Sequence, residues 1–288
     1  MLYIIIGPTA VGKTKYAIAL AKKVNGEIIS ADSMQVYKGM NIGTAKPSKR
    51  EMRGISHHLI DLKLPNEEWN VSLFVDTAEK LIQDIRRRGK TPIIVGGTGL
   101  YIWTFLEGFS FPIAPSDKKL REKLSKLSSE KLYARLKKVD PPAAKKIHPN
   151  DKKRIIRALE VYELTGKKMS VLQKKTRDQR PETRDQETKI ICLNMPREKL
   201  YKKIETRVDK MVKKGLVEEV KKLVKKGYGK QLTAMQALGY KEIIDYLEGR
   251  VSKEEAIATL KKRTRHFARR QLIWFRRFKD AKWVEVKR

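Results

Sequence analysis

The chain of 288 residues contains 66 lysine and arginine residues against 33 acidic ones, a formal net charge of +33. Hydrophobic residues make up 40%, enough for a buried core, and the single cysteine, Cys192, excludes an internal disulfide or a zinc site of several cysteines. The charge favours a polyanionic partner such as nucleic acid, because phosphate contacts release condensed counterions. The alternative is a lysine-rich thermophile surface, which normally brings matching glutamate that this chain lacks.

The sequence contains no apolar run that approaches the roughly 20 residues of a membrane span. Its N-terminal segment enters a strand and a glycine loop directly, without the basic start of a signal peptide. We therefore expect a cytoplasmic enzyme that makes no membrane contact.

The most informative motif runs from Gly7 to Thr14 and fits the phosphate-loop pattern of Gly, four residues, Gly-Lys and Ser or Thr. The apolar residues 2–6 predict a strand before it, and residues 15–23 predict a helix after it. In such a loop the backbone N–H groups bind phosphate oxygens, Lys13 reaches the terminal phosphates and Thr14 binds Mg²⁺. The predicted diphosphate-binding residues are Gly7, Pro8, Thr9, Ala10, Val11, Gly12, Lys13 and Thr14. A chance glycine turn is the alternative; the motif indicates pyrophosphate, with ATP as the default source.

Residues 1–110 alternate between strand and helix patterns. Strands are predicted over residues 2–6, 27–31, 58–62 and 92–95. A long helix with one apolar face follows the third of these, with Asn70 as its cap and Gly89 at its end. This alternation predicts an α/β fold with a phosphate-loop-type parallel sheet covered by helices on both faces.

The pattern changes near residue 111, where a lysine-rich helical segment without strand signals begins. We predict an inserted helical subdomain over residues 112–188, ending in a polar loop from Lys174, while residues 1–111 and 189–288 form the catalytic core. The sheet resumes at residues 189–195, and three further helices follow. The last of these helices covers about residues 254–278 and has two distinct sides. We expect its aromatic side in the core, formed by Phe267, Gln271, Trp274 and Phe278. We expect its basic side to contact phosphates, through Lys262, Arg265, Arg269 and Arg276.

Three polar residues stand out beyond the phosphate loop. Asp32 follows the second strand, where ligands of parallel sheets bind, and its carboxylate can accept a proton; a turn-capping aspartate is the alternative. Arg207 lies beside an apolar helix stripe, which predicts either a diphosphate contact or a buried structural ion pair. Thr98 belongs to a second glycine cluster, residues 96–99, which follows a strand and is a weak signal alone.

Together these segments resemble the bacterial tRNA dimethylallyltransferases, also called tRNA isopentenyltransferases. The single cysteine does not supply the zinc finger that eukaryotic relatives often carry. The matching motifs are in family order and cover nearly the whole chain: residues 7–14, 32–37, 43–47, 96–101, 148–151, Arg154, 157–160, 236–241, 270–271 and 274–275.

The resemblance implies transfer of a dimethylallyl group from dimethylallyl diphosphate to the exocyclic N6 amine of the adenosine on the 3′ side of the anticodon, in tRNAs that read codons beginning with U. It implies catalytic roles for Asp32, Thr98 and Arg207, and Mg²⁺ on Thr14. The implied tRNA-binding residues are Asp32, Ser33, Met34, Gln35, Thr98, Arg121, Lys153, Arg154, Ile155, Ile156, Arg157, Gln236, Ala237, Leu238, Gly239, Tyr240 and Lys241. The expected partner is the anticodon stem-loop of tRNA, and we expect a monomer.

Three other functions remain open on the sequence. A small-molecule enzyme on this scaffold, such as an adenylate isopentenyltransferase or a nucleoside kinase, needs neither the basic insertion nor the basic last helix. A phosphate-loop ATPase acting on RNA normally carries a metal-binding Asp after the strand at 92–95, which is missing here, although Asp61 or Asp32 could substitute. A non-enzymatic RNA-binding protein does not need Asp32 as a proton acceptor.

Overall fold

The computed structural model describes residues 1–108, 117–172 and 187–286. The chain forms two compact units. The core unit consists of Met1–Leu106 and Glu182–Arg288, and the insertion unit consists of Glu107–Pro181. The boundary expected at residues 111 and 112 lies outside the described residues, as does the polar loop expected over residues 174–188 except for its last two residues. The last of these, Thr188, already belongs to a strand, so the sheet resumes one residue earlier than expected.

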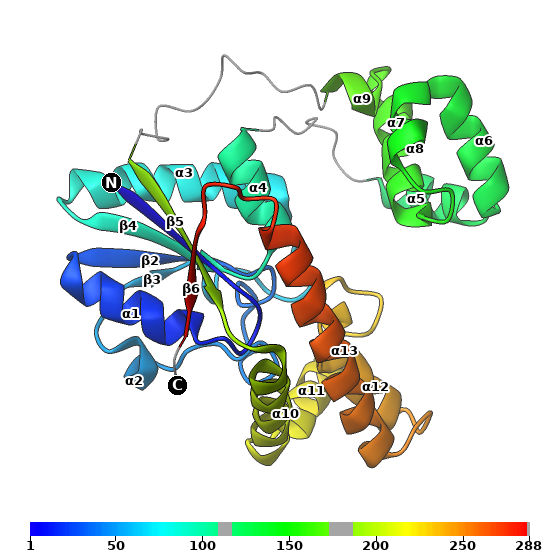
Figure 1. Ribbon diagram of the computed structural model, residues 1–288. Helices are drawn as coiled ribbons and strands as arrows, with labels where there is room; N and C mark the ends of the chain where they lie inside the picture. Colours follow the sequence, from blue (N-terminus) through cyan, green and yellow to red (C-terminus); the bar gives the residue numbers. More distant parts are fainter. Residues whose placement is uncertain (109–116, 173–186, 287–288) are drawn as a thin grey trace. The chain divides into compact units, whose positions relative to one another are not determined.

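The core unit contains a six-stranded sheet in the order β3-β2-β4-β1-β5-β6, in which all neighbouring strands are parallel (Figure 1). Ile4 of the central strand β1 lies opposite Ile94 of β4 and Ile190 of β5. This arrangement confirms the predicted α/β class. The strands are β1 (Leu2–Ile6), β2 (Gly26–Ala31), β3 (His57–His58), β4 (Thr91–Gly96), β5 (Thr188–Asn194) and β6 (Lys282–Glu285).

Helices cover both faces of this sheet (Figure 1). Ile4 and Ile6 belong to one buried cluster, with residues of α3 and α4, whereas Ile5 belongs to a second cluster, with residues of α1 and α10. Successive strand side chains point to opposite faces, so a strand buried on both faces needs a continuous apolar run. The helices of this unit are α1 (Lys13–Lys23), α2 (Lys49–Met52), α3 (Val71–Arg87), α4 (Gly99–Glu107), α10 (Arg197–Lys213), α11 (Leu216–Lys225), α12 (Tyr240–Leu247) and α13 (Lys253–Phe275), with a 3-10 turn at Ala234–Gln236.

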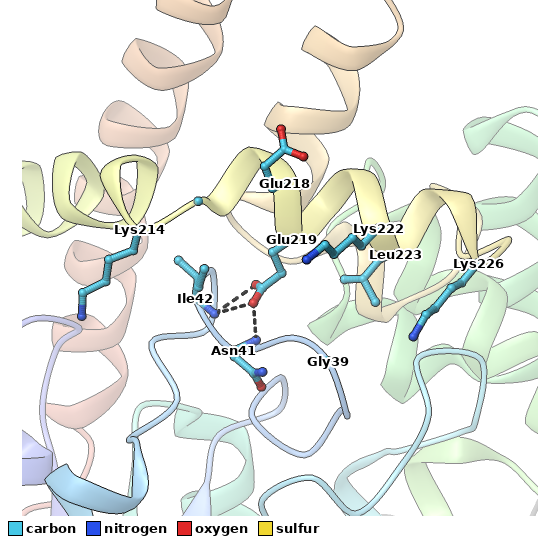
Figure 2. A pocket seen from close by; sticks show the side chains of 10 residues that line it. Gly39, Asn41, Ile42, Lys214, Glu218, Glu219, Lys222, Leu223 and Lys226 are labelled. Carbon is cyan, nitrogen blue, oxygen red and sulfur yellow. Dashed lines mark hydrogen bonds between the residues drawn. The ribbon is translucent and has the colours of Figure 1, made fainter.

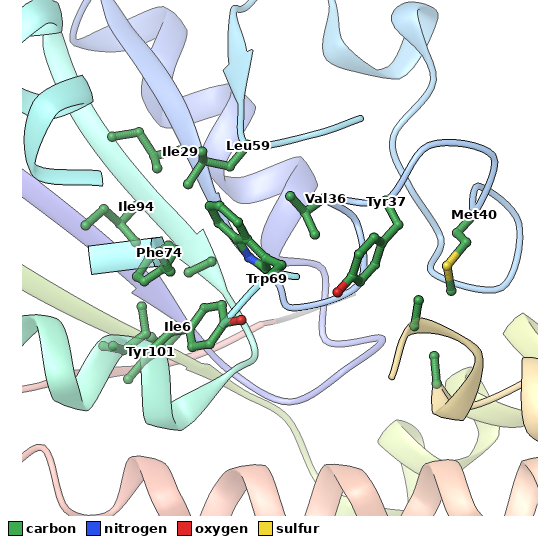
Figure 3. Packing of buried hydrophobic residues seen from close by; sticks show 14 of the residues in the cluster. Ile6, Ile29, Val36, Tyr37, Met40, Leu59, Trp69, Phe74, Ile94 and Tyr101 are labelled. Atoms are coloured by element: carbon green, nitrogen blue, oxygen red, sulfur yellow. The ribbon is translucent and has the colours of Figure 1, made fainter. Parts of the chain in front are cut away.

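The larger buried cluster fixes α3 and α4 against the sheet (Figure 3). Phe74 of α3 stacks on Tyr101 of α4, with ring centroids 4.6 Å apart. Asn70 caps α3 by accepting a hydrogen bond from the Leu73 amide at 3.1 Å, which confirms the predicted start. Gly89, with φ of +67°, follows the end of this helix. The packing anchors the loop before α4, which carries Thr98.

The predicted third strand is wrong in length. Only His57 and His58 pair with β2, because Leu59 and Asp61 adopt positive φ values of 62° and 53° that turn the backbone out of the sheet. The short apolar run after His58, which suggested a strand, therefore forms a turn.

Two elements of the core unit were missed by the sequence analysis. Four helices, not three, follow β5, because α12 begins directly after Gly239. The edge strand β6 is short and mostly exposed, so it lacks an apolar run. The expected buried side of the last helix is also partly wrong: Gln271 and Phe278 are buried as predicted, but Phe267 and Trp274 are only half-buried. The buried positions of α13 are Ala256, Leu260, Ala268, Gln271 and Phe275.

Over residues 117–172 the insertion unit consists of helices joined by short turns. Its own buried cluster includes Leu124, Leu132, Leu136 and Leu159. Asp140 caps its third helix by accepting a hydrogen bond from the Ala143 amide at 3.1 Å. The helices are α5 (Lys118–Ser125), α6 (Ser129–Val139), α7 (Pro141–Lys146), α8 (Lys152–Thr165) and α9 (Met169–Leu172).

Candidate active site

The phosphate loop connects β1 to α1, as its pattern predicts. Gly7 and Gly12 have positive φ values of 152° and 107°, and Gly12 is the residue before the first turn of α1. A Cβ atom on Gly7 would lie 2.6 Å from the Leu193 carbonyl oxygen, so this position requires glycine. The loop therefore brings the N-terminus of α1, with its free N–H groups, to the carboxyl end of the sheet.

Lys13 is half-buried and donates hydrogen bonds to the carbonyl oxygens of Gly7 and Pro8, at 2.8 and 2.9 Å. Burial and the nearby Arg207 guanidinium lower its pKa to about 7, although Asp32 and Cys192 oppose this shift. The ammonium group is thus held in a site that already contains a second cation.

Arg207 projects from α10 and is also half-buried. Burial lowers its pKa, while Asp32 acts in the opposite direction. Within residues 1–108, 117–172 and 187–286, its guanidinium makes no ion pair or hydrogen bond. The structural ion pair considered from the sequence is therefore not formed among these residues, although the Asp32 carboxylate is near enough to act on the guanidinium electrostatically.

Asp32 and Thr98 follow neighbouring strands, because Ala31 of β2 lies opposite Gly96 of β4. Asp32 Oδ1 accepts hydrogen bonds from the amides of Met34 at 2.9 Å and Gln35 at 3.2 Å. The turn-capping alternative is thus correct for one oxygen, but the described residues give Oδ2 no hydrogen-bond partner. One carboxylate can form the turn and still offer an oxygen to a substrate.

The Thr98 hydroxyl connects the two strand ends. Its Oγ1 accepts a hydrogen bond from the Ser33 amide at 3.3 Å, and its own amide donates to the Ala31 carbonyl at 3.4 Å. The weak second glycine cluster therefore does place Thr98 beside the Asp32 segment.

Gln271 of α13 reaches into the same region, a contact that sequence reasoning did not identify. It is 4% exposed, accepts a hydrogen bond from the Thr9 amide at 2.8 Å and donates one to the Gly97 carbonyl at 2.8 Å. A polar residue on the apolar side of a helix was the signal available in the sequence.

The loop after the Asp32 segment is held by Glu219 of α11 (Figure 2). This carboxylate accepts hydrogen bonds from the backbone amides of Asn41, Ile42 and Gly43, and from the Tyr240 hydroxyl at 2.6 Å. The neighbouring cavity of about 350 Å³ is lined by Gly39, Asn41, Ile42, Lys214, Gly215, Glu218, Glu219, Lys222, Leu223 and Lys226. It lies beside the loop and does not include Lys13.

The structure limits how several predicted tRNA-binding residues can act. The side chains of Ile155 and Tyr240 are fully buried, and Ala237 is 7% exposed, so these side chains build the core and do not line a surface. Arg121 and Arg157 both bind the buried carboxylate of Glu160. The exposed members of the set are Arg121, Lys153, Arg154 and Gln236, and the half-buried ones include Ile156, Leu238 and Lys241.

No group of three or more His, Cys, Asp or Glu side chains in the described ranges could hold a metal ion. In the same ranges, no helix is both long and apolar enough to cross a membrane. Thr14 is exposed at the start of α1.

The parallel sheet with a phosphate loop between β1 and α1 defines a phosphate-loop α/β protein. Residues 35–278 match the family model described as IPP transferase. A tRNA dimethylallyltransferase of Caldanaerobacter subterraneus subsp. tengcongensis is 52% identical, over 99% of this chain and 91% of the relative. One of Thermoanaerobacter sp. is 53% identical with the same coverage.

Similar solved structures indicate the same family as these relatives. The chain is similar to the tRNA isopentenylpyrophosphate transferase of Bacillus halodurans, with a TM-score of 0.72, 45% identity and coverage of 99% of this chain and 89% of that one. A eukaryotic dimethylallyltransferase acting on tRNA gives a TM-score of 0.82 at 33% identity, over 99% and 73% of the two chains. The chain therefore belongs to the IPP transferase family of tRNA dimethylallyltransferases and is a prenyl-transferring enzyme.

Proposed function

We propose that this enzyme transfers the dimethylallyl group of dimethylallyl diphosphate to the N6 amine of the adenosine on the 3′ side of the anticodon. The substrates are tRNAs that read codons beginning with U, and the products are N6-dimethylallyladenosine and diphosphate. The observation that carries the proposal is the pair of half-buried cations, Lys13 and Arg207, beside a phosphate loop and next to Asp32. Two such cations call for a multiply charged anion such as a diphosphate.

The diphosphate is the leaving group, so negative charge develops on its oxygens as the allylic C1–O bond breaks. Lys13, Arg207 and the N–H groups at the N-terminus of α1 are placed to stabilise that charge. Their positions do not require a phosphoryl group to be transferred. The same loop that commonly binds ATP serves here to hold an isoprenoid by its diphosphate.

The nucleophile is the adenine N6 amine, whose lone pair is delocalised into the ring. As N6 forms its bond to C1, the amine loses a proton, and Oδ2 of Asp32 is the acceptor that the turn leaves available. Thr98, anchored to the Ser33 amide, lies next to this carboxylate segment and contacts the substrate near the reaction centre. Arg207 thus acts on the diphosphate as the C1–O bond breaks, and Asp32 acts on the amine as the N6–C1 bond forms.

Mg²⁺ fits this site as an ion held mainly by the substrate. It prefers to keep several waters and to bind phosphate oxygens with few protein ligands, which agrees with the exposed Thr14 hydroxyl and with the lack of an acidic cluster in the described residues. Thr14 is the residue that would hold it, and the ion would neutralise charge on the leaving diphosphate.

The second substrate is the anticodon stem-loop, and the net charge of +33 supports an RNA partner. The target base must leave its stack, which costs a few kcal/mol that phosphate contacts can offset. We assign RNA contacts to the Asp32–Gln35 segment, to exposed side chains such as Lys153 and Arg154 of the insertion unit, and to the surface around Gln236 and Lys241. The enzyme acts as a monomer in the cytoplasm.

The test replaces Asp32 by asparagine. Asn keeps an Oδ1 acceptor for the Met34 and Gln35 amides, so the turn survives, but it cannot take the proton. We expect transfer of radiolabelled dimethylallyl to an anticodon stem-loop to fall about 10²–10⁴-fold, with a far smaller change in affinity for the RNA. Asp76→Asn, at an exposed position of α3, is the matched control.

Three outcomes contradict the proposal. Unchanged transfer by the Asp32→Asn variant removes Asp32 from the chemistry. A preference of the unmodified enzyme for AMP over the stem-loop identifies a small-molecule enzyme. RNA-stimulated ATP hydrolysis without alkylation identifies an ATPase.

A further inference from the structure

Gln271 joins two loops that are far apart in the sequence. Its carboxamide oxygen accepts from the Thr9 amide in the phosphate loop, 262 positions away. Its carboxamide nitrogen donates to the Gly97 carbonyl in the loop before α4, 174 positions away. Both hydrogen bonds are 2.8 Å long, and the side chain is 4% exposed.

The two joined loops carry the two halves of the proposed reaction. The phosphate loop leads into Lys13 and Thr14, which face the leaving diphosphate. The other loop leads directly from Gly97 into Thr98, which lies beside Asp32 and the acceptor amine. A change in the spacing between the two loops therefore changes the distance between leaving group and nucleophile.

The chemistry of the contact needs a carboxamide. One end must accept from an N–H group and the other must donate to a carbonyl, and among long side chains only glutamine offers both groups in one plane. Glutamate would bring a second acceptor against the Gly97 carbonyl, while lysine or arginine would bring a second donor against the Thr9 amide. The Gly97 contact is buried and the Thr9 contact is partly buried, so losing either hydrogen bond leaves a backbone group without its partner.

Gly97 lacks a side chain because the carboxamide occupies that space. A Cβ atom built on Gly97 would lie 2.3 Å from Gln271 Nε2 and 3.7 Å from Lys13 Nζ. The backbone of Gly97 does not adopt a positive φ, so steric contact with Gln271 is the constraint at this position.

We infer that Gln271 is a positioning residue for prenyl transfer, which sets the separation between the diphosphate-binding loop and the Thr98 loop. This inference rests on the proposed function. The competing role is purely structural, in which Gln271 only fastens α13 to the sheet and affects stability alone.

The test compares Gln271→Met, which keeps length and volume but removes both hydrogen bonds, with Gln271→Glu, which keeps only the acceptor. At a temperature where both variants are folded, we expect kcat to fall about 100-fold, because a misplacement near 1 Å costs roughly that much. KM for each substrate should change far less. Binding of inorganic diphosphate, measured by calorimetry, should stay within a few fold of the unmodified protein.

Glu27→Gln is the matched control, because Glu27 is also buried and also joins separate elements, but at the opposite ends of the strands. This variant should lose stability and keep kcat. If the Gln271→Met variant behaves in the same way, with a lower Tm and an unchanged kcat, the inference is overturned.

A double-mutant cycle sharpens the result. Gly97→Ala alone pushes the carboxamide away and should reproduce the loss of kcat. In a Gln271→Ala background the space is vacant, so adding Gly97→Ala should cost little further. Independent, additive losses would contradict the contact. Failure of the proposed function is seen separately, because the unmodified enzyme would then not prenylate the stem-loop at all.

Discussion

The Tyr240 hydroxyl donates a hydrogen bond of 2.6 Å to the Glu219 carboxylate. The same carboxylate accepts hydrogen bonds from the backbone amides of Asn41, Ile42 and Gly43 (Figure 2). Burial and the Glu219 carboxylate raise the pKa of Tyr240 well above its usual range, so the hydroxyl stays protonated. Tyr240 therefore supports the loop after the Asp32 segment from inside the core. In this loop the carbonyl oxygens of Thr44 and Ala45 accept hydrogen bonds from Gln35 Nε2.

We predict that Tyr240→Phe lowers the free energy of unfolding by about 1 kcal/mol, the usual value of one hydrogen bond, and that Glu219→Ala costs more because several amides lose their acceptor. KM for the stem-loop should rise in Glu219→Ala more than KM for the diphosphate substrate. Urea unfolding and steady-state kinetics measure both effects. Glu218→Ala, at the exposed neighbouring position, should change neither.

Lys13 gives a prediction about pH. Burial and Arg207 lower its pKa to about 7 in the free enzyme, so the ammonium is lost as the pH rises through neutrality. We expect kcat/KM for dimethylallyl diphosphate to fall above about pH 7, because this ratio reports groups of the free enzyme.

Arg207→Gln should raise the pKa of Lys13 by removing a nearby cation. The fall of kcat/KM on the alkaline side of the profile, the alkaline limb, should therefore move to higher pH. A limb that stays in place would show that Arg207 does not act on Lys13. Asp32→Asn should move the limb in the opposite direction, because the Asp32 carboxylate raises the pKa of Lys13. Profiles are compared as relative kcat/KM, since both variants lose activity.

Glu27 predicts a stability effect far from the site. It is 2% exposed and binds Arg88 through two hydrogen bonds, one of them 2.8 Å long, and Lys90 and His58 at 2.7 Å each. The hydrogen bonds from Arg88, Lys90 and His58 outweigh burial and hold the pKa of Glu27 far below its usual range. We expect Glu27→Gln to cost about 3 kcal/mol of unfolding free energy at pH 7, as removal of one partner from a buried pair does.

The pH dependence of this stabilisation has a definite sign. A lowered folded-state pKa means that the contribution is complete above the unfolded pKa, near 4.5, and declines as the pH falls below it. The difference between the unmodified protein and Glu27→Gln in urea should therefore shrink from pH 7 to pH 3. A constant difference would argue against the charged network.

A substitution at Arg121 can distinguish a structural role of this side chain from a direct contact with RNA. Its guanidinium binds both oxygens of Glu160, at 2.8 and 2.9 Å, and Glu160 is fully buried. Burial alone would raise the pKa of Glu160, but the hydrogen bonds from Arg121 and Arg157 bring it below its usual value. We predict that Arg121→Lys destabilises the insertion unit by losing the two-pronged contact.

The measurement is hydrogen exchange of α5 and α8 in the full chain, together with affinity for the stem-loop at several salt concentrations. Lys153→Ala, at an exposed position of α8, should keep exchange unchanged and weaken RNA binding. Normal exchange with weakened binding in Arg121→Lys would instead make Arg121 an RNA contact.

Several features could be predicted from the sequence because their signals are local. The phosphate loop needs glycine at fixed positions within eight residues, and doubly buried strands need unbroken apolar runs. Asn70 and the start of α3 follow from hydrogen bonding over three residues. The strand-end positions of Asp32 and Thr98 follow from the βα alternation. The family motifs added the reaction, which no local pattern contains.

The tertiary structure alone decided which polar groups meet. Gln271 and Thr9 are 262 positions apart, and no periodicity links them. Whether Arg207 had a carboxylate partner, and whether Tyr240 faced RNA or Glu219, also depended on how separate helices pack. A sequence pattern fixes which residues share a face of one element, whereas a partner on another element is selected by long-range burial and geometry. The sequence therefore predicted a diphosphate-binding loop, and the packing of α10, α11 and α13 decided which polar groups surround it and how the neighbouring loops are held.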